Sequence, residues 1–325
     1  MTAAAIEARA FWTVAPGRGE IRSERLPSPA ADQRLVHTLA SGVSRGTEAL
    51  VFAGRVPESQ FAAMRAPMMG GTFPFPVKYG YNAVGMTEDG ARIFALHPHQ
   101  DVFLAPAAMC IPVPDSVPTH RAVLAANMET ALNLMWDATP LAGERIAVIG
   151  AGVVGLLAAS LLARIPATRV TVIDLRPERA AVAAMLGCAF ALPSAAPDDQ
   201  ELVVHSSASE AGLALALSCA AFEARIVEAS WYGDHAPAVP LGEHFHARRL
   251  RLIATQVGAI ATAMRGRRSH ADRLAQALAL LADPVYDGLV EASTPFATLP
   301  DTMPALLAGE GHFPVISYGP SRCSV

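Results

Sequence analysis

Cysteine is scarce in this chain, and its spacing fits neither a disulfide framework nor a zinc motif. The 325 residues include four cysteines, with no CxxC pair among them: Cys110, Cys188, Cys219 and Cys323. Cysteine-rich zinc sites use closely spaced pairs, and disulfides are typical of oxidising compartments. We therefore expect a cytoplasmic protein without a structural zinc site.

Charge and long apolar segments are limited as well. Charged residues make up 17% of the chain, the net charge is −4, and both signs are mixed along the sequence. An extended basic surface for phosphate backbones is therefore not expected. The longest apolar segments contain glycines and fall short of the roughly 20 residues that span a bilayer, and the N-terminus does not read as a secretory signal. We expect neither nucleic acid nor membrane as a partner.

Hydrophobic residues are abundant, at 52%, and they occur in two patterns of predicted secondary structure. Short β-like runs separated by Gly and Pro fill residues 1–126, and a strand-and-turn texture returns in residues 259–325. In residues 127–258, strands alternate with helices, which is the pattern of a parallel sheet covered on both faces. The sequence therefore predicts an α/β protein with a β-rich, barrel-like domain and a doubly wound parallel sheet.

The segment RIAVIGAGVVG, residues 145–155, joins a predicted buried strand to a predicted apolar helix. Gly150 permits a tight turn, Gly152 lets the backbone approach a pyrophosphate, and Gly155 allows the helix to pack closely on the strand. A second strand ends at Asp174, where a carboxylate accepts hydrogen bonds from a ribose. These features together predict a dinucleotide site at the N-terminus of the helix. Two further contacts are expected in the first turn of that helix, at Val153 and Val154.

The identity of the dinucleotide depends on the residues that follow the second strand. Asp174 favours a ribose with two free hydroxyls, and therefore NAD over NADP. Arg176 and Arg179 weaken this preference, because a guanidinium there would bind a 2′-phosphate; alternatively, both belong to a solvated helix start. NAD is the predicted cofactor, with NADP as the alternative.

The order of these parts resembles the medium-chain dehydrogenase/reductase superfamily, which includes the zinc alcohol dehydrogenases. The likeness rests on SGVSRGTEAL at 41–50, GYNAVG at 80–85 and the central glycine motif, and it is nearest the bacteriochlorophyllide dehydrogenase-like branch. It implies a GroES-like catalytic domain that clasps a Rossmann domain, with the active site in the cleft. It also implies a homodimer that pairs through an edge of the Rossmann sheet.

The chain departs from the zinc members at their metal ligands. Where those members carry Cys-Gly-Thr/Ser-Asp, residues 45–48 read Arg-Gly-Thr-Glu, so Arg45 replaces the cysteine. Where they carry Gly-His-Glu, residues 80–82 read Gly-Tyr-Asn, so Tyr81 replaces the histidine. Only Glu129 remains where a third protein ligand often lies. A catalytic zinc site needs three protein ligands and an open position, so we expect no zinc.

The replacing residues suggest a metal-free way to polarise a substrate carbonyl. Arg45 and Tyr81 supply hydrogen-bond donors, and Tyr81 is a candidate proton donor. Thr47 matches the hydroxyl residue that relays protons in alcohol-oxidising relatives. The alternatives are that Arg45 pairs with Glu129 or Glu48, that Tyr81 only packs, and that Thr47 only anchors its turn.

Further contacts are suggested by family position. Ser206 and Ser207 follow a strand end that passes a cofactor ribose in relatives, although their side chains would also suit a helix cap. Trp231 and His246 are candidate contacts near the nicotinamide or substrate, with core packing and fold support as the alternatives, and Asn82 is a candidate substrate contact. Residues 52–82, rich in Phe and Met, would suit a bulky, partly apolar substrate, or form a loop with a small core of its own.

The sequence therefore predicts an oxidoreductase that acts on a small molecule without zinc. NAD(P) would exchange hydride directly with a secondary alcohol or a carbonyl, with Arg45, Thr47 and Tyr81 at the substrate oxygen. One alternative is reduction of an activated double bond in a quinone or enone. Another is a catalytically silent protein that binds the cofactor as a sensor or partner subunit.

Overall fold

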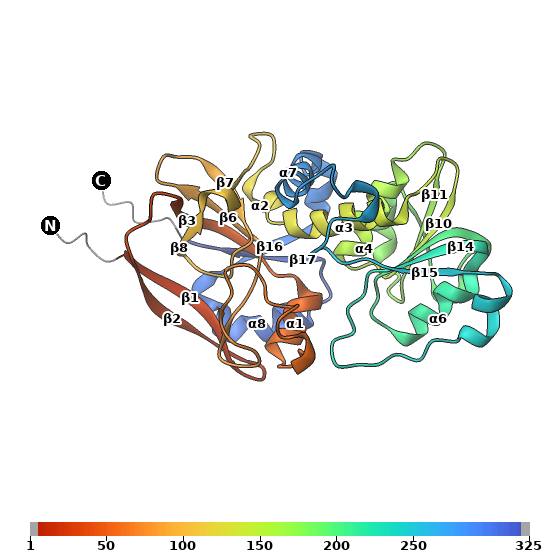
Figure 1. The fold of residues 1–325 in the computed structure, drawn as a ribbon, viewed down its shortest axis with the longest axis horizontal. Helices are drawn as coiled ribbons and strands as arrows, with labels where there is room; N and C mark the ends of the chain where they lie inside the picture. Colours follow the sequence, from red (N-terminus) through yellow and green to blue (C-terminus); the bar gives the residue numbers. More distant parts are fainter. Residues whose placement is uncertain (1–5, 320–325) are drawn as a thin grey trace. The chain divides into compact units, whose positions relative to one another are not determined.

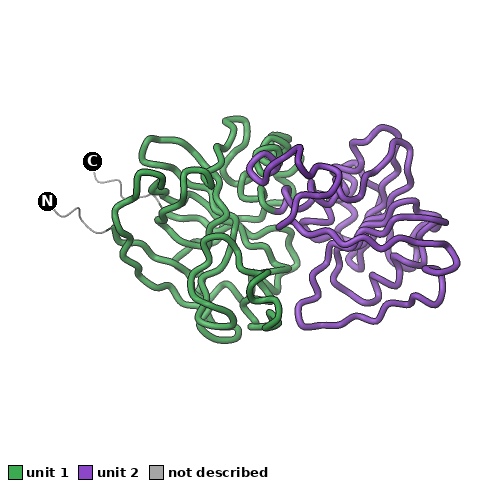
Figure 2. The backbone as a smooth tube through the Cα atoms, in the orientation of Figure 1, with its two compact units in different colours: residues 1–126, 274–325 green, residues 127–273 purple. Residues whose placement is uncertain are grey.

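The computed structural model describes residues 6–319, which divide into two compact units (Figure 2). The first contains the described residues up to Ala126 and those from Leu274 onward, and the second contains Asn127–Arg273. The expected return to the first unit at residue 259 is wrong, because residues 259–273 belong to the second unit. Hydrogen bonds explain this: Arg273 donates to the carbonyl of Ala259, and the Ala261 amide donates to Asn133.

The first unit is built from two antiparallel-rich sheets (Figure 1). One sheet has the strand order β2-β1-β5-β4, and the other has β16-β17-β3-β6-β7-β9, with β8 paired to β3. The strands are β1 Ile6–Ala15, β2 Arg18–Leu26, β3 Gln33–Gly42, β4 Gly70–Gly71, β5 Val77–Lys78, β6 Ala83–Thr87, β7 Arg92–Ala95, β8 Val102–Pro106, β9 Ile111–Pro112, β16 Val290–Pro295 and β17 Phe313–Ser317. The β-rich expectation for this part of the chain is confirmed.

Helices are few and short in the first unit, and they close its core. They are α1 Arg45–Phe52, α2 Thr119–Ala122 and α8 Leu299–Ala308, with most of α7 His270–Leu280. Phe52 of α1 packs with Leu299 and Met303 of α8 and with Phe11 of β1 in one apolar cluster. This packing fixes α1, which carries Arg45, Thr47 and Glu48, against the sheets.

The second unit is a six-stranded, all-parallel sheet with the order β12-β11-β10-β13-β14-β15. Its strands are β10 Arg145–Ile149, β11 Arg169–Ile173, β12 Ala189–Ala191, β13 Gln200–His205, β14 Ala220–Glu228 and β15 Arg251–Ala254. Its helices are α3 Ala125–Ala138, α4 Val153–Ala163, α5 Arg179–Met185 and α6 Glu210–Cys219. This is the doubly wound order whose direction reverses between β10 and β13, where dinucleotides bind.

Local sequence explains why this unit folds as expected. β10 is a run of apolar, mostly buried residues, as a strand covered on both faces requires. α4 is apolar on all sides and almost wholly buried, which suits a helix packed into the core of the sheet. Among the described residues, no helix is long and apolar enough to cross a membrane.

Candidate cofactor and catalytic sites

The turn between β10 and α4 has the geometry that the glycine motif predicts. Gly150 has a φ of +106°, a conformation that L side chains rarely adopt. A Cβ on Gly155 would lie 2.0 Å from the Gly150 carbonyl oxygen, so only glycine lets α4 approach the turn this closely. A Cβ on Gly152 would meet no atom of the described chain within 4 Å, and this residue opens toward free space. The residues present fit a pyrophosphate at this turn.

A cavity of about 920 Å³ lies over the carboxyl ends of the central strands of the second unit. Gly150, Gly152, Asp174, Ser206 and Ser207 all line it. The structure thus brings together residues from the ends of β10, β11 and β13, as a dinucleotide site requires. Val153 and Val154 form the first turn of α4, directly after Gly152.

Asp174 is held by the glycine turn itself. Its Oδ2 accepts a hydrogen bond of 2.7 Å from the Ala151 amide, and its Oδ1 accepts one of 3.0 Å from the Arg176 amide. An ionised carboxylate has about four acceptor positions, so ribose hydroxyls still find acceptors on it. Asp174 therefore has two tasks, to fix the turn and to face the cavity.

The two arginines after β11 differ in position. Arg176 lines the cavity, and its Nε lies 3.4 Å from Oδ1 of Asp174. Arg179 is 3% exposed, so the alternative of a solvated helix start is wrong for it. Only Arg176 is placed where it would meet a 2′-phosphate.

Of the other predicted contacts in the second unit, some lie at the cavity and some do not. Ser206 donates toward the carbonyls of Ile149 and Gly150, which ties β13 to the glycine turn. Trp231 is half-buried and does not line the cavity, and His246 is exposed. The residues of that loop that do line the cavity are Pro240, Glu243 and His244. Sequence reasoning missed them, because their placement depends on how a long loop folds back.

In the first unit, Tyr81 lies against the start of α1. Its hydroxyl is hydrogen-bonded to the side chains of Ser44 and Thr47. Burial and the nearby charge of Glu48 raise the pKa of Tyr81 to about 12, although the two hydroxyl partners lower it. Tyr81 is therefore a protonated donor at neutral pH, and Thr47 shares its hydrogen bond.

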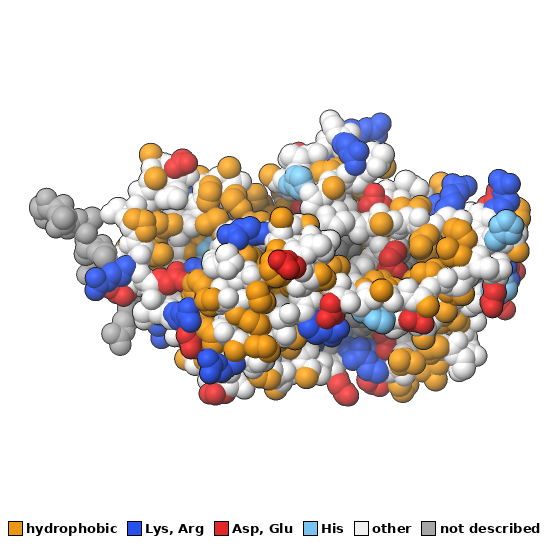
Figure 3. Space-filling view, turned by 60° about the horizontal axis from the view of Figure 1, so that its bottom comes forward, with side chains coloured by type: hydrophobic (Ala, Val, Ile, Leu, Met, Phe, Trp, Pro, Cys, Tyr) orange, Lys and Arg blue, Asp and Glu red, His pale blue; other side chains and the backbone are white. Residues whose placement is uncertain are grey.

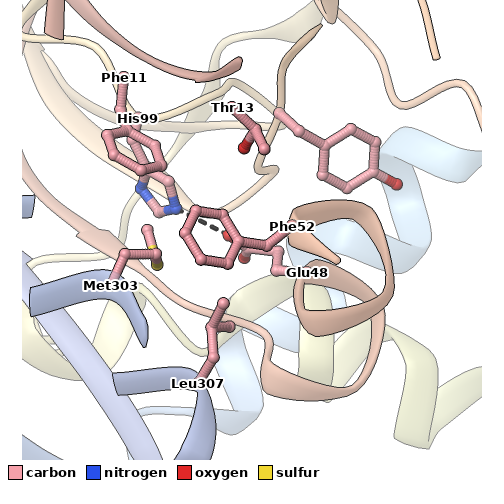
Figure 4. A pocket seen from close by; sticks show the side chains of 8 residues that line it. Phe11, Thr13, Glu48, Phe52, His99, Met303 and Leu307 are labelled. Atoms are coloured by element: carbon pink, nitrogen blue, oxygen red, sulfur yellow. Dashed lines mark hydrogen bonds and ion pairs between the residues drawn. The ribbon is translucent and has the colours of Figure 1, made fainter. Parts of the chain in front are cut away.

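Glu48 and His99 form a buried pair that sequence reasoning did not connect (Figure 4). Oε1 of Glu48 accepts a bond of 2.7 Å from the Ser44 amide at the start of α1, and its Oε2 lies 2.9 Å from His99 Nε2. His99 Nδ1 is 2.7 Å from the Ser41 hydroxyl, which lies 2.8 Å from the hydroxyl of Tyr318. This network fixes α1 to β3 and β17. The presence of a glutamate in RGTE was visible, but the residues that meet it were not.

Arg45 does not make either of the pairs suggested for it. Its Nη1 lies 2.9 Å from Oε1 of Glu291, and its Nε donates a 2.6 Å hydrogen bond to the Leu306 carbonyl near the end of α8. Glu48 is bound to His99 and Ser44 instead, as described above. Arg45 therefore forms an ion pair, as the alternative expected, but its partner is Glu291 and not Glu129 or Glu48.

Glu129 is held by a different arginine. Its Oε1 lies 3.0 Å from Nε of Arg273, and both side chains are almost fully buried. Arg273 also bonds the side chain of Asn133 and the carbonyl of Val257. Burial raises the pKa of Glu129, and Arg273 only partly offsets that effect. Glu129 is a structural residue within the second unit.

These contacts do not fit a catalytic zinc. Arg45 and Tyr81 have no lone pair suited to zinc at neutral pH, and Glu129 is bound to a guanidinium. Within residues 6–319, no group of three or more His, Cys, Asp or Glu side chains is arranged to hold a metal ion.

The remaining predicted substrate residues form packed structure. Asn82 is 0% exposed, and its carbonyl accepts from the Gly42 amide, so it is not open to a substrate. The loop before it has a small aromatic core in which Phe61 contacts Phe73, Phe73 contacts Tyr79, and Tyr79 meets Tyr81 edge to face. The alternative of a loop with its own core is therefore correct. Both signs of charge are mixed on the face shown in Figure 3.

Comparison with known proteins agrees with this architecture. No family model matches the chain. A segment of 150 residues is 29% identical to an uncharacterized zinc-type alcohol dehydrogenase-like protein of Haemophilus influenzae, covering 42% of this chain and 44% of that protein. The match therefore spans less than half of that relative's length.

Solved structures match over nearly the whole chain. A Sinorhizobium meliloti protein described as a zinc-binding dehydrogenase, bound to NADP, has a TM-score of 0.76 at 16% identity, covering 96% of this chain and 99% of that one. The 2R,3R-butanediol dehydrogenase of Bacillus subtilis has a TM-score of 0.76 at 15% identity, covering 95% and 99%. The chain thus has the fold of these dehydrogenases, with a β-rich unit and a Rossmann-type parallel sheet, and a segment of it is similar to a zinc-type alcohol dehydrogenase-like protein.

Proposed function

We propose that this protein is a zinc-independent, NAD(P)-dependent oxidoreductase that interconverts a secondary alcohol and a carbonyl in a small molecule. The observation that carries the proposal is the hydrogen-bonded group of Tyr81, Thr47 and Ser44, in which Tyr81 stands where zinc members carry a histidine ligand. The glycine turn and cavity of the second unit supply the second requirement, a site for the dinucleotide. The similar structures solved with NADP and with NADH support a nicotinamide cofactor.

Tyr81 performs the task that a Lewis acid performs in zinc members. Its hydroxyl donates a hydrogen bond to the substrate carbonyl oxygen and then transfers its proton to that oxygen. A nicotinamide cofactor held at the glycine turn and Asp174 would supply the hydride for the carbonyl carbon. Since the raised pKa keeps the phenol protonated, Tyr81 is better suited to donate a proton during reduction than to accept one during oxidation.

Thr47 and Arg45 have supporting roles. Thr47 holds the Tyr81 hydroxyl from the first turn of α1. Arg45 ties the start of α1 to Glu291 and to the end of α8, so we assign it to positioning and not to contact with substrate. Glu48 and His99 complete the support of α1 from the buried side.

For the cofactor, we propose a preference for NAD over NADP. A 2′-phosphate next to Asp174 would meet a carboxylate that the Ala151 amide holds in place. Arg176 is the only candidate within the cavity lining to offset that repulsion. Titration of NADH and NADPH by fluorescence measures this preference. Equal affinities for NADH and NADPH would contradict the proposal. In that case, a loss of NADPH affinity alone in Arg176→Ala would show that Arg176 offsets the repulsion by Asp174.

The test of the reaction combines a substrate panel with a tyrosine pair. Purified protein is assayed for NAD(P)H oxidation with ketones, aldehydes and enones, and its zinc content is measured on samples prepared without chelators. Tyr81→Phe should lower kcat by about 100-fold, because the proton donor is lost, while cofactor affinity stays unchanged. Tyr79→Phe removes a neighbouring hydroxyl that bonds the Met64 carbonyl, and it should retain wild-type activity.

The outcomes separate the possible readings. Unchanged kcat in Tyr81→Phe would contradict the role of Tyr81, and one zinc per chain would contradict the metal-free mechanism. A response to enones alone would replace carbonyl reduction by double-bond reduction. Cofactor binding without turnover of any substrate would favour a silent sensor or partner subunit.

A further inference from the structure

A buried histidine at the carboxyl end of β13 is bonded on both ring nitrogens. His205 is 0% exposed, its Nδ1 lies 2.7 Å from Oε2 of Glu228 at the end of β14, and its Nε2 lies 2.7 Å from the Ser207 hydroxyl. Serine, histidine and carboxylate are thus in series, at the distances of a charge-assisted hydrogen-bonded chain. Ser207 lines the cavity assigned to the dinucleotide, but His205 and Glu228 belong neither to that lining nor to the Tyr81 group.

The surrounding partners fix the direction of the hydrogen bonds. Glu228 accepts from the Ser230 amide at 2.7 Å and from the Tyr232 hydroxyl at 3.2 Å. Burial would raise the pKa of Glu228, but the bonds from His205 and Ser230 outweigh it and lower that pKa. Glu228 is therefore an ionised acceptor, so His205 Nδ1 donates to it. In the neutral ring, Nε2 is then left as an acceptor for the Ser207 proton.

The other side of Ser207 is ordered as well. Its oxygen lies 2.8 Å from the Ser209 hydroxyl, and Ser209 accepts a 3.0 Å bond from the Gly212 amide as the N-cap of α6. A Cβ on Gly212 would lie 2.3 Å from the Ser207 oxygen and 2.7 Å from His205 Nε2. A glycine is therefore needed at this position to leave room for the cluster.

The location of Ser207 exposes it to a ligand. Ser207, Ala211 and Gly212 line the 920 Å³ cavity, while the histidine behind Ser207 is excluded from solvent. Between the strand and α6, Ala208 has a φ of +51°, so Ser207 lies on a sharp strand-to-helix turn. The first turn of α6, with the positive end of the helix dipole, follows directly.

We propose that Ser207, His205 and Glu228 form an acyl-transfer triad, with Ser207 as a nucleophile toward activated esters that enter the cavity. Ser, His and a carboxylate in this order are recognised as a triad by geometry and not by sequence position. The proposal stands on the second unit alone and does not depend on the oxidoreductase reaction.

The chemistry balances without a further reagent. The Ser207 oxygen attacks the ester carbonyl carbon, and its proton moves to His205 Nε2. The bond from carbon to the leaving oxygen breaks, and that oxygen takes the proton from His205. Water then attacks the acyl carbon and gives a proton to His205. The bond from that carbon to the Ser207 oxygen breaks, His205 returns the proton to this oxygen, and a carboxylic acid and the free serine are released. Glu228 holds the ring and stabilises its protonated form throughout.

The direct test uses a fluorophosphonate probe on the full-length protein, followed by peptide mass spectrometry. The probe should form an adduct on Ser207 with loss of fluoride. Ser218 lines the same cavity, but its hydroxyl donates to the Leu215 carbonyl, so it serves as an internal control and should stay unmodified. Hydrolysis of p-nitrophenyl acetate, measured in parallel, should depend on the same serine and disappear in Ser207→Ala.

Two variants test the role of the histidine. His205→Gln should slow labelling of Ser207 by about 100-fold, because it removes the general base. If that variant does not fold, as judged by circular dichroism, Glu228→Gln is used instead and should also slow labelling. His235→Gln, at an exposed position that does not line the cavity, should be labelled as the wild type is. An unlabelled Ser207, equal labelling of Ser218, or unchanged rates in a folded His205 or Glu228 variant would overturn the proposal.

Discussion

At the scale of single residues, burial of a titratable group gives a testable pH dependence. His97 is 3% exposed and stacks on Phe103 with ring centroids 3.8 Å apart. Burial lowers the pKa of His97 from 6.5 to about 3, with smaller contributions in the same direction from Lys78 and His99, and the bond to the Pro98 carbonyl opposes the shift. The folded protein therefore keeps this ring neutral in mild acid.

The sign of the effect follows from proton binding. Below pH 6.5 the unfolded chain protonates His97 and the folded chain does not, so the free energy of unfolding falls as pH falls toward 3. Its slope from this group approaches about 1.4 kcal/mol per pH unit. His97→Gln, whose side chain does not titrate, should lose this slope in urea unfolding measured from about pH 6.5 to 4.5. His235→Gln, at an exposed position, should retain it, and identical slopes in wild type and His97→Gln would contradict the prediction.

Side-chain partners were the least predictable feature from sequence. The partner of Arg45 is Glu291, and the partner of Glu129 is Arg273, each far along the chain. Which carboxylate an arginine meets depends on the packing of α1 against β16 and α8, and of α3 within its own unit. Residue types indicated that buried charges needed partners, as they did for Glu129, but not which ones.

At the scale of secondary-structure elements, the turn from β10 to α4 was predictable because its requirements are local. Strand, glycines and helix are contiguous in residues 145–163, so the sequence itself determines the tight turn and the close packing. The cavity wall from Glu243 and His244 has no such local signal.

The glycines of this turn offer a matched pair of variants. Gly155→Ala would place a methyl group 2.0 Å from the Gly150 carbonyl oxygen, so it should destabilise the fold by about 1–3 kcal/mol. Gly152→Ala adds a methyl group in open space, so its unfolding midpoint should stay close to that of the wild type. NADH affinity should nevertheless fall by about tenfold or more in Gly152→Ala, because the methyl group occupies space that a pyrophosphate needs. Wild-type affinity in that variant would place the cofactor elsewhere.

At the scale of the whole molecule, the alternation of strands and helices predicted a doubly wound parallel sheet. The start of this alternation also marked the boundary at which the first unit ends, at Ala126. The return near residue 259 was misplaced, because Arg273 binds the carbonyls of Val257 and Ala259 and keeps that segment in the second unit. A change in the pattern of apolar residues shows where short strands give way to alternating strands and helices. It does not show which unit a connecting segment is hydrogen-bonded to.

Self-association is the remaining expectation at this scale, and we propose a homodimer formed through the edge of the parallel sheet. β15 is the last strand of that sheet, and its Leu252 is 41% exposed, so an unpaired edge with an apolar side chain is available. Light scattering should give about twice the chain mass of 34.0 kDa. Leu252→Glu should shift the mass toward the monomer, since it puts a charge at the edge. Met185→Glu, at a 42% exposed position on α5, should leave the dimer intact. A mass near one chain for the wild type would contradict the dimer, and equal loss in both variants would contradict the assignment of this edge.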